Sequence, residues 1–279
     1  MTQITASMVK ELREATNVGM MECKKALEEC NGDKDAAIKL LRERGIAIAG
    51  KKASREASQG MIDAAILNDG KKGVMIKVNC ETDFVVRNEN FQNFVKELLE
   101  ASKTIADGEL AEVKKNELTA KVAEIGENII IAGNVTYEVE GEGLVASYIH
   151  MGGKVGVLLE LGFEKADTVG NEKLQELAKD LTLQVAASAP EYLNRDAVPE
   201  EVIESERAIF AKQMEDKPQE ILDKIIDGKL NKFYSEVCLL EQAFVKEPDQ
   251  SVTQLIDKVA KDLGETIEVR RYTRYQIGA

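Results

Sequence analysis

Apolar residues near the N-terminus recur at three- and four-residue steps, as they do along one face of an α-helix. These steps predict helices over residues 4–15, 20–30 and 36–44, with Asn31-Gly32-Asp33 ending the second and capping the third. A bundle this small is only marginally stable alone, so we expect it to lean on the rest of the protein or on a partner. The polar and basic residues 49–59 predict a linker or a frayed helix.

An internal repeat follows the bundle. GMIDAAILNDGKKGVMIKVN at 60–79 aligns with GLVASYIHMGGKVGVLLELG at 143–162, so the numbering of the two copies is offset by 83. The alignment continues without a gap into the segments that begin at Asn88 and Asn171. Each copy therefore predicts a strand, a tight glycine turn, a second strand and a helix. With two copies only, this is a duplication and not a solenoid.

Each copy is predicted to end with one more strand, at 128–139 in the first and at 236–245 in the second. If Glu124 and Glu236 correspond, their numbers differ by 112, which exceeds the repeat offset by 29. We place this insertion within 189–228, which has two amphipathic stripes typical of helices. Two interpretations stay open for this predicted hairpin: a contact between subunits, or a lid packed on its own core.

The expected fold is α+β, with a small three-helix N-terminal domain, a duplicated core of small antiparallel sheets and an inserted antiparallel helical hairpin. The predicted divisions are 1–55 for the helical domain, 56–142 for the first repeat, 143–188 and 229–263 for the second repeat, 189–228 for the hairpin and 264–279 for a C-terminal module. Within that module, residues 270–274 predict either a closing strand or a basic contact.

Composition narrows the function. The formal charge is −13, which argues against a protein that wraps nucleic acid. No Trp, one His and 5% aromatic residues leave few groups for base stacking or general base catalysis. The four cysteines form no close pair of zinc ligands, and no uncharged apolar run approaches the ~20 residues of a membrane helix. We therefore expect a cytoplasmic protein that is not an enzyme and has no metal, cofactor or membrane partner.

His150 is the single histidine and aligns with Leu67 at the end of a strand, beside a turn. No relay that needs a second histidine is available, so we expect no catalytic residue. The two interpretations of His150 are a surface or packing residue and a contact residue. The glycine turns lack the spacing of a phosphate-binding loop.

The second copy serves as an internal control for the loop that follows the second strand. The first copy has Thr82-Asp83-Phe84-Val85 where the second has Lys165-Ala166-Asp167-Thr168. The shared scaffold needs a connection here, but it does not need these four residues. Phe84 either faces outward on a short loop or packs the helix onto the sheet, with Thr82 or Asp83 as the helix cap.

Two segments, TNVGMMECKKAL at 16–27 and VNCETDFVVRN at 78–88, resemble the signature segments of the bacterial translation elongation factor Ts family, and the resemblance extends over the whole chain. It implies a guanine-nucleotide exchange factor for elongation factor Tu. It also implies that the N-terminal domain is similar to ubiquitin-associated domains and holds the GTPase, with Met20 and Met21 in the contact. Of the two, we expect Met21 to be the more exposed.

The same resemblance implies that Thr82, Asp83, Phe84 and Val85 provoke loss of Mg²⁺ from the partner, and that His150 lies near a second contact. It further implies a homodimer through the 189–228 hairpin and a C-terminal module after about residue 264. Two other classes remain as alternatives. One is an adaptor that binds a GTPase through its N-terminal helices without accelerating release, and the other is an enzyme with an undetected site.

Overall fold

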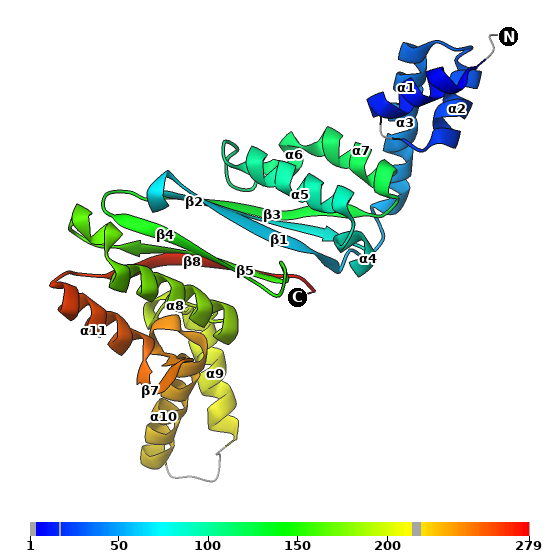
Figure 1. Ribbon diagram of the computed structural model, residues 1–279. Helices are drawn as coiled ribbons and strands as arrows, with labels where there is room; N and C mark the ends of the chain where they lie inside the picture. Colours follow the sequence, from blue (N-terminus) through cyan, green and yellow to red (C-terminus); the bar gives the residue numbers. More distant parts are fainter. Residues whose placement is uncertain (1–3, 17, 214–218, 279) are drawn as a thin grey trace.

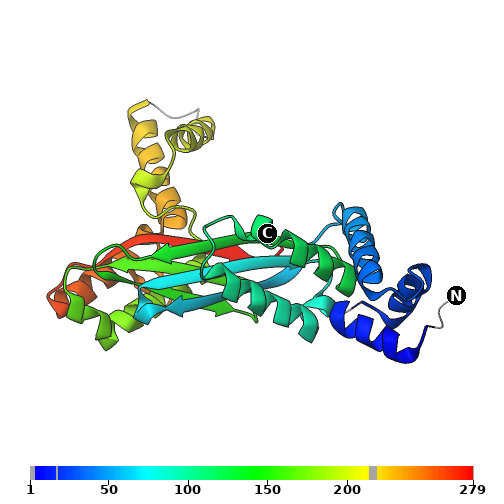
Figure 2. The same cartoon turned by 90° about the horizontal axis from the view of Figure 1, so that it is seen from above.

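The computed structural model of the protein describes residues 4–16, 18–213 and 219–278 (Figure 1). Two three-stranded antiparallel sheets pack face to face, and helices cover the outer face of each sheet. A helical bundle stands at the end nearest the N-terminus, and a helical hairpin projects from the core (Figures 1 and 2). The predicted α+β class is therefore confirmed.

The N-terminal bundle consists of α1 (Ala6–Thr16), α2 (Met20–Glu29) and α3 (Lys34–Lys52). The Asp33 carboxylate accepts from Ala36 N at 2.9 Å, so the predicted cap of the third helix is confirmed. The core of the bundle is formed by Leu12, Cys23, Ala26, Leu27, Ala37 and Leu41. The third helix is longer than predicted and continues to Lys52, so the start of the 49–59 segment is helix, and its remainder up to β1 is a linker.

The first repeat forms a sheet in the order β1-β2-β3, from β1 (Gln59–Leu67), β2 (Lys72–Cys80) and β3 (Ile129–Glu138). Its outer face is covered by α5 (Glu89–Ser102), α6 (Leu110–Val113) and α7 (Lys115–Ile125). Val74, Ile76 and Val78 alternate along β2 toward these helices, where they join a cluster that includes Phe91. The predicted strand, turn, strand and helix are all present.

The second repeat forms a sheet in the order β4-β5-β8, from β4 (Gly143–His150), β5 (Val155–Gly162) and β8 (Glu268–Gln276). Its outer face is covered by α8 (Glu172–Ser188) and α11 (Val252–Leu263). The short 3-10 turn η2 (Ala166–Gly170) precedes α8. The two hairpin turns match in conformation: Asn68-Asp69-Gly70, the 3-10 turn η1, and Met151-Gly152-Gly153 all have positive φ.

The strand predicted at 236–245 is wrong. Helix α10 (Gln219–Val237) runs into this segment, and the 3-10 turn η4 (Leu239–Glu241) follows. A two-residue strand, β6 (Ala243–Phe244), then pairs with β7 (Glu247–Ser251) outside the main sheets. The apolar character of the segment comes from Cys238 and Leu239, which are fully buried below the end of the helix. Residues 264–279, predicted as a separate module, contribute β8, and the closing strand at 270–274 is confirmed.

The duplication extends into the third strand of each sheet, with a larger offset. Tyr137 pairs with Gly73 and Tyr275 pairs with Gly156, so the numbering of the third strands differs by 138 instead of 83. Each sheet has a register shift at the same place, after Lys77 in β2 and after Glu160 in β5. The insertion in the second copy is therefore considerably longer than predicted, since it must account for the whole difference between these two offsets.

The inserted hairpin consists of α9 (Glu200–Lys212) and α10, preceded by the 3-10 turn η3 (Arg195–Ala197). Residues 214–218 of the predicted hairpin lie outside the described residues. Ile226 and Leu230 of α10 are buried, whereas Ile209 of α9 is exposed. Figure 2 shows both helices extending away from the sheets, which does not fit a lid over the core.

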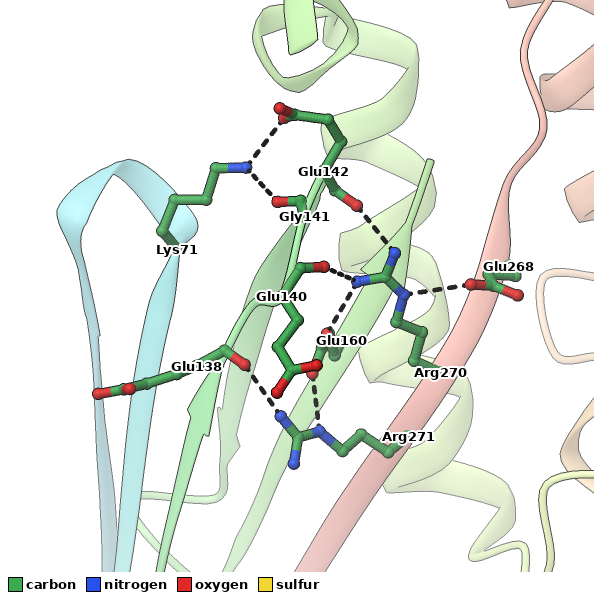
Figure 3. Close-up of polar contacts among 9 residues, drawn as sticks. All are labelled: Lys71, Glu138, Glu140, Gly141, Glu142, Glu160, Glu268, Arg270 and Arg271. Carbon is green, nitrogen blue, oxygen red and sulfur yellow. Dashed lines mark hydrogen bonds and ion pairs between the residues drawn. The ribbon is translucent and has the colours of Figure 1, made fainter. Parts of the chain in front are cut away.

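A polar cluster attaches the connection between the two repeats to the second sheet (Figure 3). Glu160 is 3% exposed and accepts from Arg271 Nε at 2.7 Å and from Arg270 Nη1 at 3.3 Å. The two guanidinium groups also donate to the backbone carbonyl oxygens of Glu138, Glu140 and Glu142. Lys71 of the first hairpin turn reaches the Glu142 carboxylate at 3.0 Å. These contacts hold the two repeats together at the point where the chain crosses between them.

Candidate functional site

The Thr82-Asp83-Phe84-Val85 loop forms a single helical turn, α4 (Asp83–Val86), directly after β2. The Thr82 side chain caps it by accepting from Val85 N at 3.4 Å. Val85 is buried in the cluster beneath α5, whereas Phe84 is 79% exposed. Phe84 is the most exposed large apolar side chain in the part of the chain that the structure describes. The interpretation in which Phe84 packs the helix onto the sheet is therefore wrong, because Val85 takes the inward position.

Glu127, which sequence reasoning missed, fixes the backbone of this loop. One oxygen of its carboxylate accepts from Glu81 N at 3.1 Å and from Thr82 N at 3.0 Å, and the other accepts from the Thr82 hydroxyl at 2.6 Å. Asn128 N in turn donates to the Glu81 carboxylate at 2.6 Å. The start of α4 is thus held by the short segment that joins α7 to β3.

A sequence signal for Glu127 exists in the third-strand register. Gly126-Glu127-Asn128-Ile129 matches Gly264-Glu265-Thr266-Ile267 at the larger of the two offsets. The first residue of each segment has positive φ and ends a helix, α7 in one copy and α11 in the other. At the offset of 83 that aligns the first two strands, these two segments are not aligned with each other. An alignment at that offset alone therefore does not reveal that Glu127 corresponds to Glu265.

Buried Cys80 also forms a hydrogen bond with this loop. Its thiol donates to the Thr82 carbonyl oxygen with an S–O distance of 3.3 Å. Burial is the largest cause that raises the pKa of the Cys80 thiol to about 12, so the group stays protonated and able to donate at neutral pH. On the outer side, the Asp83 carboxylate accepts from Arg87 at 2.9 Å, and both side chains are exposed. Such a surface pair contributes little to stability.

Met20 and Met21 lie in the first turn of α2, on the surface of the N-terminal bundle. They are 55% and 65% exposed, so Met21 is the more exposed, as predicted. Met20 does not share the buried face of Cys23 and Leu27, although its helical spacing from them would allow it. Flexible, polarisable Met side chains on a surface are suited to an adaptable apolar contact.

His150 is the last residue of β4 and is exposed, beside the turn where it was predicted. Its Nδ1 lies 2.9 Å from the Tyr148 hydroxyl, and the two rings stack with centroids 5.7 Å apart. The next residue, Met151, is exposed as well. His150 therefore belongs to a small surface patch with an aromatic and a Met side chain.

The turn that follows His150 lies against β1, the neighbour of β2 in the sheet, where Ile62 N donates to Gly153 O at 2.8 Å. Lys154 Nζ donates to Gln59 at 2.9 Å, and Gln59 pairs with Cys80 across β1 and β2. The N-terminal bundle adjoins α7 through α3, on the side of the core where α4 also lies (Figure 1). The 82–85 loop and His150 thus lie on the half of the core that is nearer the bundle, which carries Met20 and Met21.

The site has the character of a contact surface. Among the described residues, no group of three or more His, Cys, Asp or Glu side chains is placed to hold a metal ion. None of the helices in the described part of the chain is long and apolar enough to span a bilayer. What the structure does present is one exposed aromatic side chain on a firmly held loop.

Comparison with known proteins gives a consistent picture. A family model described as elongation factor TS matches residues 81–279. Elongation factor Ts of Trichlorobacter lovleyi is 43% identical over 289 residues, which cover 99% of this chain and 93% of that protein. The elongation factor Ts of Magnetococcus marinus is 44% identical over 291 residues, and that of Clostridium perfringens 42% over 292 residues, with the same coverage of both chains.

Proposed function

The chain belongs to the elongation factor Ts family of translation elongation factors, and on this basis we propose that it is a guanine-nucleotide exchange factor. It binds elongation factor Tu with GDP bound and promotes the release of GDP by disturbing the Mg²⁺ site, so that GTP can bind during elongation. It works in the cytoplasm and contributes no catalytic residue and no cofactor of its own.

The observation that carries this proposal is the outward position of Phe84. An aromatic side chain that is 79% exposed on a held loop is available to enter an apolar site on a partner. A nucleotide in a GTPase is held by phosphate-loop amides and by a Mg²⁺ ion that neutralises phosphate charge. If Phe84 displaces the segments that carry the Mg²⁺ ligands, the phosphate charge is poorly compensated and GDP leaves faster.

The same mechanism requires that exchange factor and nucleotide weaken each other's binding by an equal factor. The charge of −13 on this chain does not oppose it, because the target is a protein surface and the effect of Phe84 is local. Asp83 is paired with Arg87, so we assign it to the positioning of the loop and not to direct repulsion of phosphate.

The direct test is stopped-flow release of a fluorescent GDP from purified elongation factor Tu. We expect this protein to accelerate release strongly, and we expect added Mg²⁺ to slow the accelerated reaction because it refills the disturbed site. If a complex forms but GDP leaves at its intrinsic rate, the exchange proposal fails and the protein is an adaptor that binds through its N-terminal helices.

We assign affinity for the GTPase to Met20 and Met21, with His150 in a second contact. The double variant Met20→Ala/Met21→Ala is expected to raise the concentration for half-maximal exchange by about tenfold, since two apolar anchors of about 0.7 kcal/mol each are lost. The rate at saturation should stay near that of the parent. Titration of the exchange rate checks this, with exposed Val245→Ala as the control; a lowered saturating rate at unchanged half-saturation would contradict the assignment.

We also propose that the α9–α10 hairpin joins two copies of the chain in a homodimer. The support is an exposed apolar residue, Ile209, on a hairpin that projects from the core. An apolar side chain in this position is available to a second copy without any change in the sheets.

A further inference from the structure

We propose that Glu127 is a positioning residue for exchange: its carboxylate fixes the backbone of residues 81 and 82 so that Phe84 is presented outward in one conformation. This inference rests on the proposed function, because it concerns the same loop. Glu127 itself touches neither nucleotide nor Mg²⁺ in this mechanism; it acts through the loop.

The geometry gives Glu127 three donors on one short stretch of chain. Two are the backbone N–H groups of Glu81 and Thr82, and the third is the Thr82 hydroxyl, which also accepts from Val85 N as the cap of α4. The carboxylate therefore sets the backbone direction at the start of α4 and the orientation of its cap. Without it, two N–H groups at the start of the loop lose their acceptor.

The rest of the loop depends on few other anchors. Val85 is buried in the core and the Cys80 thiol donates to the Thr82 carbonyl oxygen, but neither contact supplies an acceptor for the N–H groups of Glu81 and Thr82. Phe84 lies between the held start of α4 and buried Val85, so its direction follows from the backbone on both sides. A Phe84 side chain on a fixed backbone loses less conformational freedom when it enters a partner than one on a mobile loop would.

The second repeat provides an internal comparison. Glu265, at the position of Glu127, accepts from Glu164 N at 3.2 Å, from Lys165 N at 2.9 Å and from the Thr168 hydroxyl at 3.0 Å. Partial desolvation opposes ionisation there, but the hydrogen bonds outweigh it and lower the pKa of Glu265. The same acidic anchor thus holds both strand-to-helix loops, and only the loop held by Glu127 carries an exposed Phe.

This duplication supplies matched variants. Glu127→Ala and Glu265→Ala each remove a carboxylate that accepts from two loop N–H groups and one Thr hydroxyl, so a purely structural role predicts similar effects for both. Glu127→Gln keeps an oxygen acceptor for the two N–H groups, while its amide can donate to the Thr82 hydroxyl. It is therefore the conservative variant that should rescue the function.

The experiment measures the saturating rate and half-saturation of GDP release from elongation factor Tu for the parent and the three variants. We expect Glu127→Ala to lower the saturating rate by about tenfold with half-saturation within about twofold, since alignment of the wedge is lost while other contacts keep affinity. Glu127→Gln should stay within about threefold of the parent, and Glu265→Ala within about twofold. Hydrogen–deuterium exchange over residues 78–88 should be faster in Glu127→Ala and unchanged in Glu265→Ala.

The outcomes separate this inference from the function on which it rests. If the parent accelerates release and Glu127→Ala matches it, the positioning role is overturned and the exchange function stands. Equal losses for Glu127→Ala and Glu265→Ala would overturn it too, because they would show a general effect on the fold. Absence of acceleration by the parent overturns both proposals. If Glu127→Ala does not fold, Glu127→Asp replaces it, because its carboxylate lies one methylene farther from the three donors: faster deuterium exchange over residues 78–88 with a lowered saturating rate supports positioning, and any other combination of the two results overturns it.

Discussion

Phe84→Ala is expected to lower the saturating rate of GDP release from elongation factor Tu by about 10- to 100-fold. Truncation of a Phe that is buried, as Phe84 would be in the complex, costs about 3–5 kcal/mol. Each 1.4 kcal/mol added to the activation free energy of GDP release slows it by a factor of about ten. Only part of the contact energy is used to move the Mg²⁺ ligands, so the expected loss lies below the full cost. Stopped-flow release of fluorescent GDP at fixed Mg²⁺ measures it.

The stability of this variant provides a sharp control. Phe84 is 79% exposed in the free protein, so its truncation should change the free energy of unfolding by less than about 0.5 kcal/mol. Val113→Ala, at another exposed apolar residue on α6, should leave both stability and exchange unchanged. A Phe84→Ala variant that folds, binds and still accelerates release at the rate of the parent would place the exchange activity elsewhere on the surface.

Much of the site was accessible from the sequence because the chain contains its own comparison. The two copies share strands, turns and helix starts, and they differ at residues 82–85, so the sequence alone distinguishes this loop. Spacing did not decide between the two directions of Phe84. The structure decides it, because only one of two adjacent apolar residues can face the core from a single helical turn, and Val85 does so.

Residues 270–274 were predicted as either a closing strand or a basic contact, but the hydrophobic pattern did not identify this segment as the third strand of the second sheet. The sequence of β8 is EVRRYTRYQ, which is polar. It fits into the sheet because two of its arginines pair with buried Glu160. The apolar segment at 236–245 looked more like a strand, but its buried residues pack beneath the end of α10. In both segments the structure is decided by contacts with residues distant in the sequence, which local strand propensity does not include.

The position of Glu127 was hidden for the same reason. A Glu between a helix and a strand is ordinary on the surface of an acidic protein, and its importance comes from donors that lie far earlier in the chain, at Glu81 and Thr82. Glu127 stands out from other glutamates only because it corresponds to Glu265. The two residues can be aligned only if the position and full length of the insertion are known. An error in one strand therefore concealed the anchor of the functional loop.

The largest effect on stability is expected at two glycines where the sheets are in close contact. Gly73 and Gly156 occupy equivalent positions on β2 and β5. A Cβ atom at Gly156 would lie 2.9 Å from Met75 Sδ and closer still to Ile62, and one at Gly73 would lie 2.5 Å from Val145 Cγ1 and 2.9 Å from Leu158 Cδ1. Because Val145 and Leu158 are the equivalents of Ile62 and Met75, the interface has an approximate two-fold symmetry.

Gly156→Val should destabilise the protein by about 3 kcal/mol, toward the upper end of overpacking costs, and lower the Tm by about 6–12 °C. Thermal unfolding followed by circular dichroism measures the shift. Gly228→Val is the control, since nothing lies within 4 Å of a Cβ there and Val is slightly better than Gly within a helix. A Gly156→Val protein with the Tm of the parent would show that the sheets separate at no cost.

The double variant tests whether the sheets respond as rigid bodies. Gly73→Val is expected to cost about as much as Gly156→Val, because the two sites face equivalent residues of the opposite sheet. If the first substitution pushes the whole sheets apart, it opens part of the space that the second one needs, so the combined loss should be smaller than the sum by about 1 kcal/mol or more. Strict additivity would instead mean that each strand adjusts locally. Since the functional loop follows β2 directly, rigid separation would also move α4 away from the turn after His150, and the exchange rate of the double variant would fall with its stability.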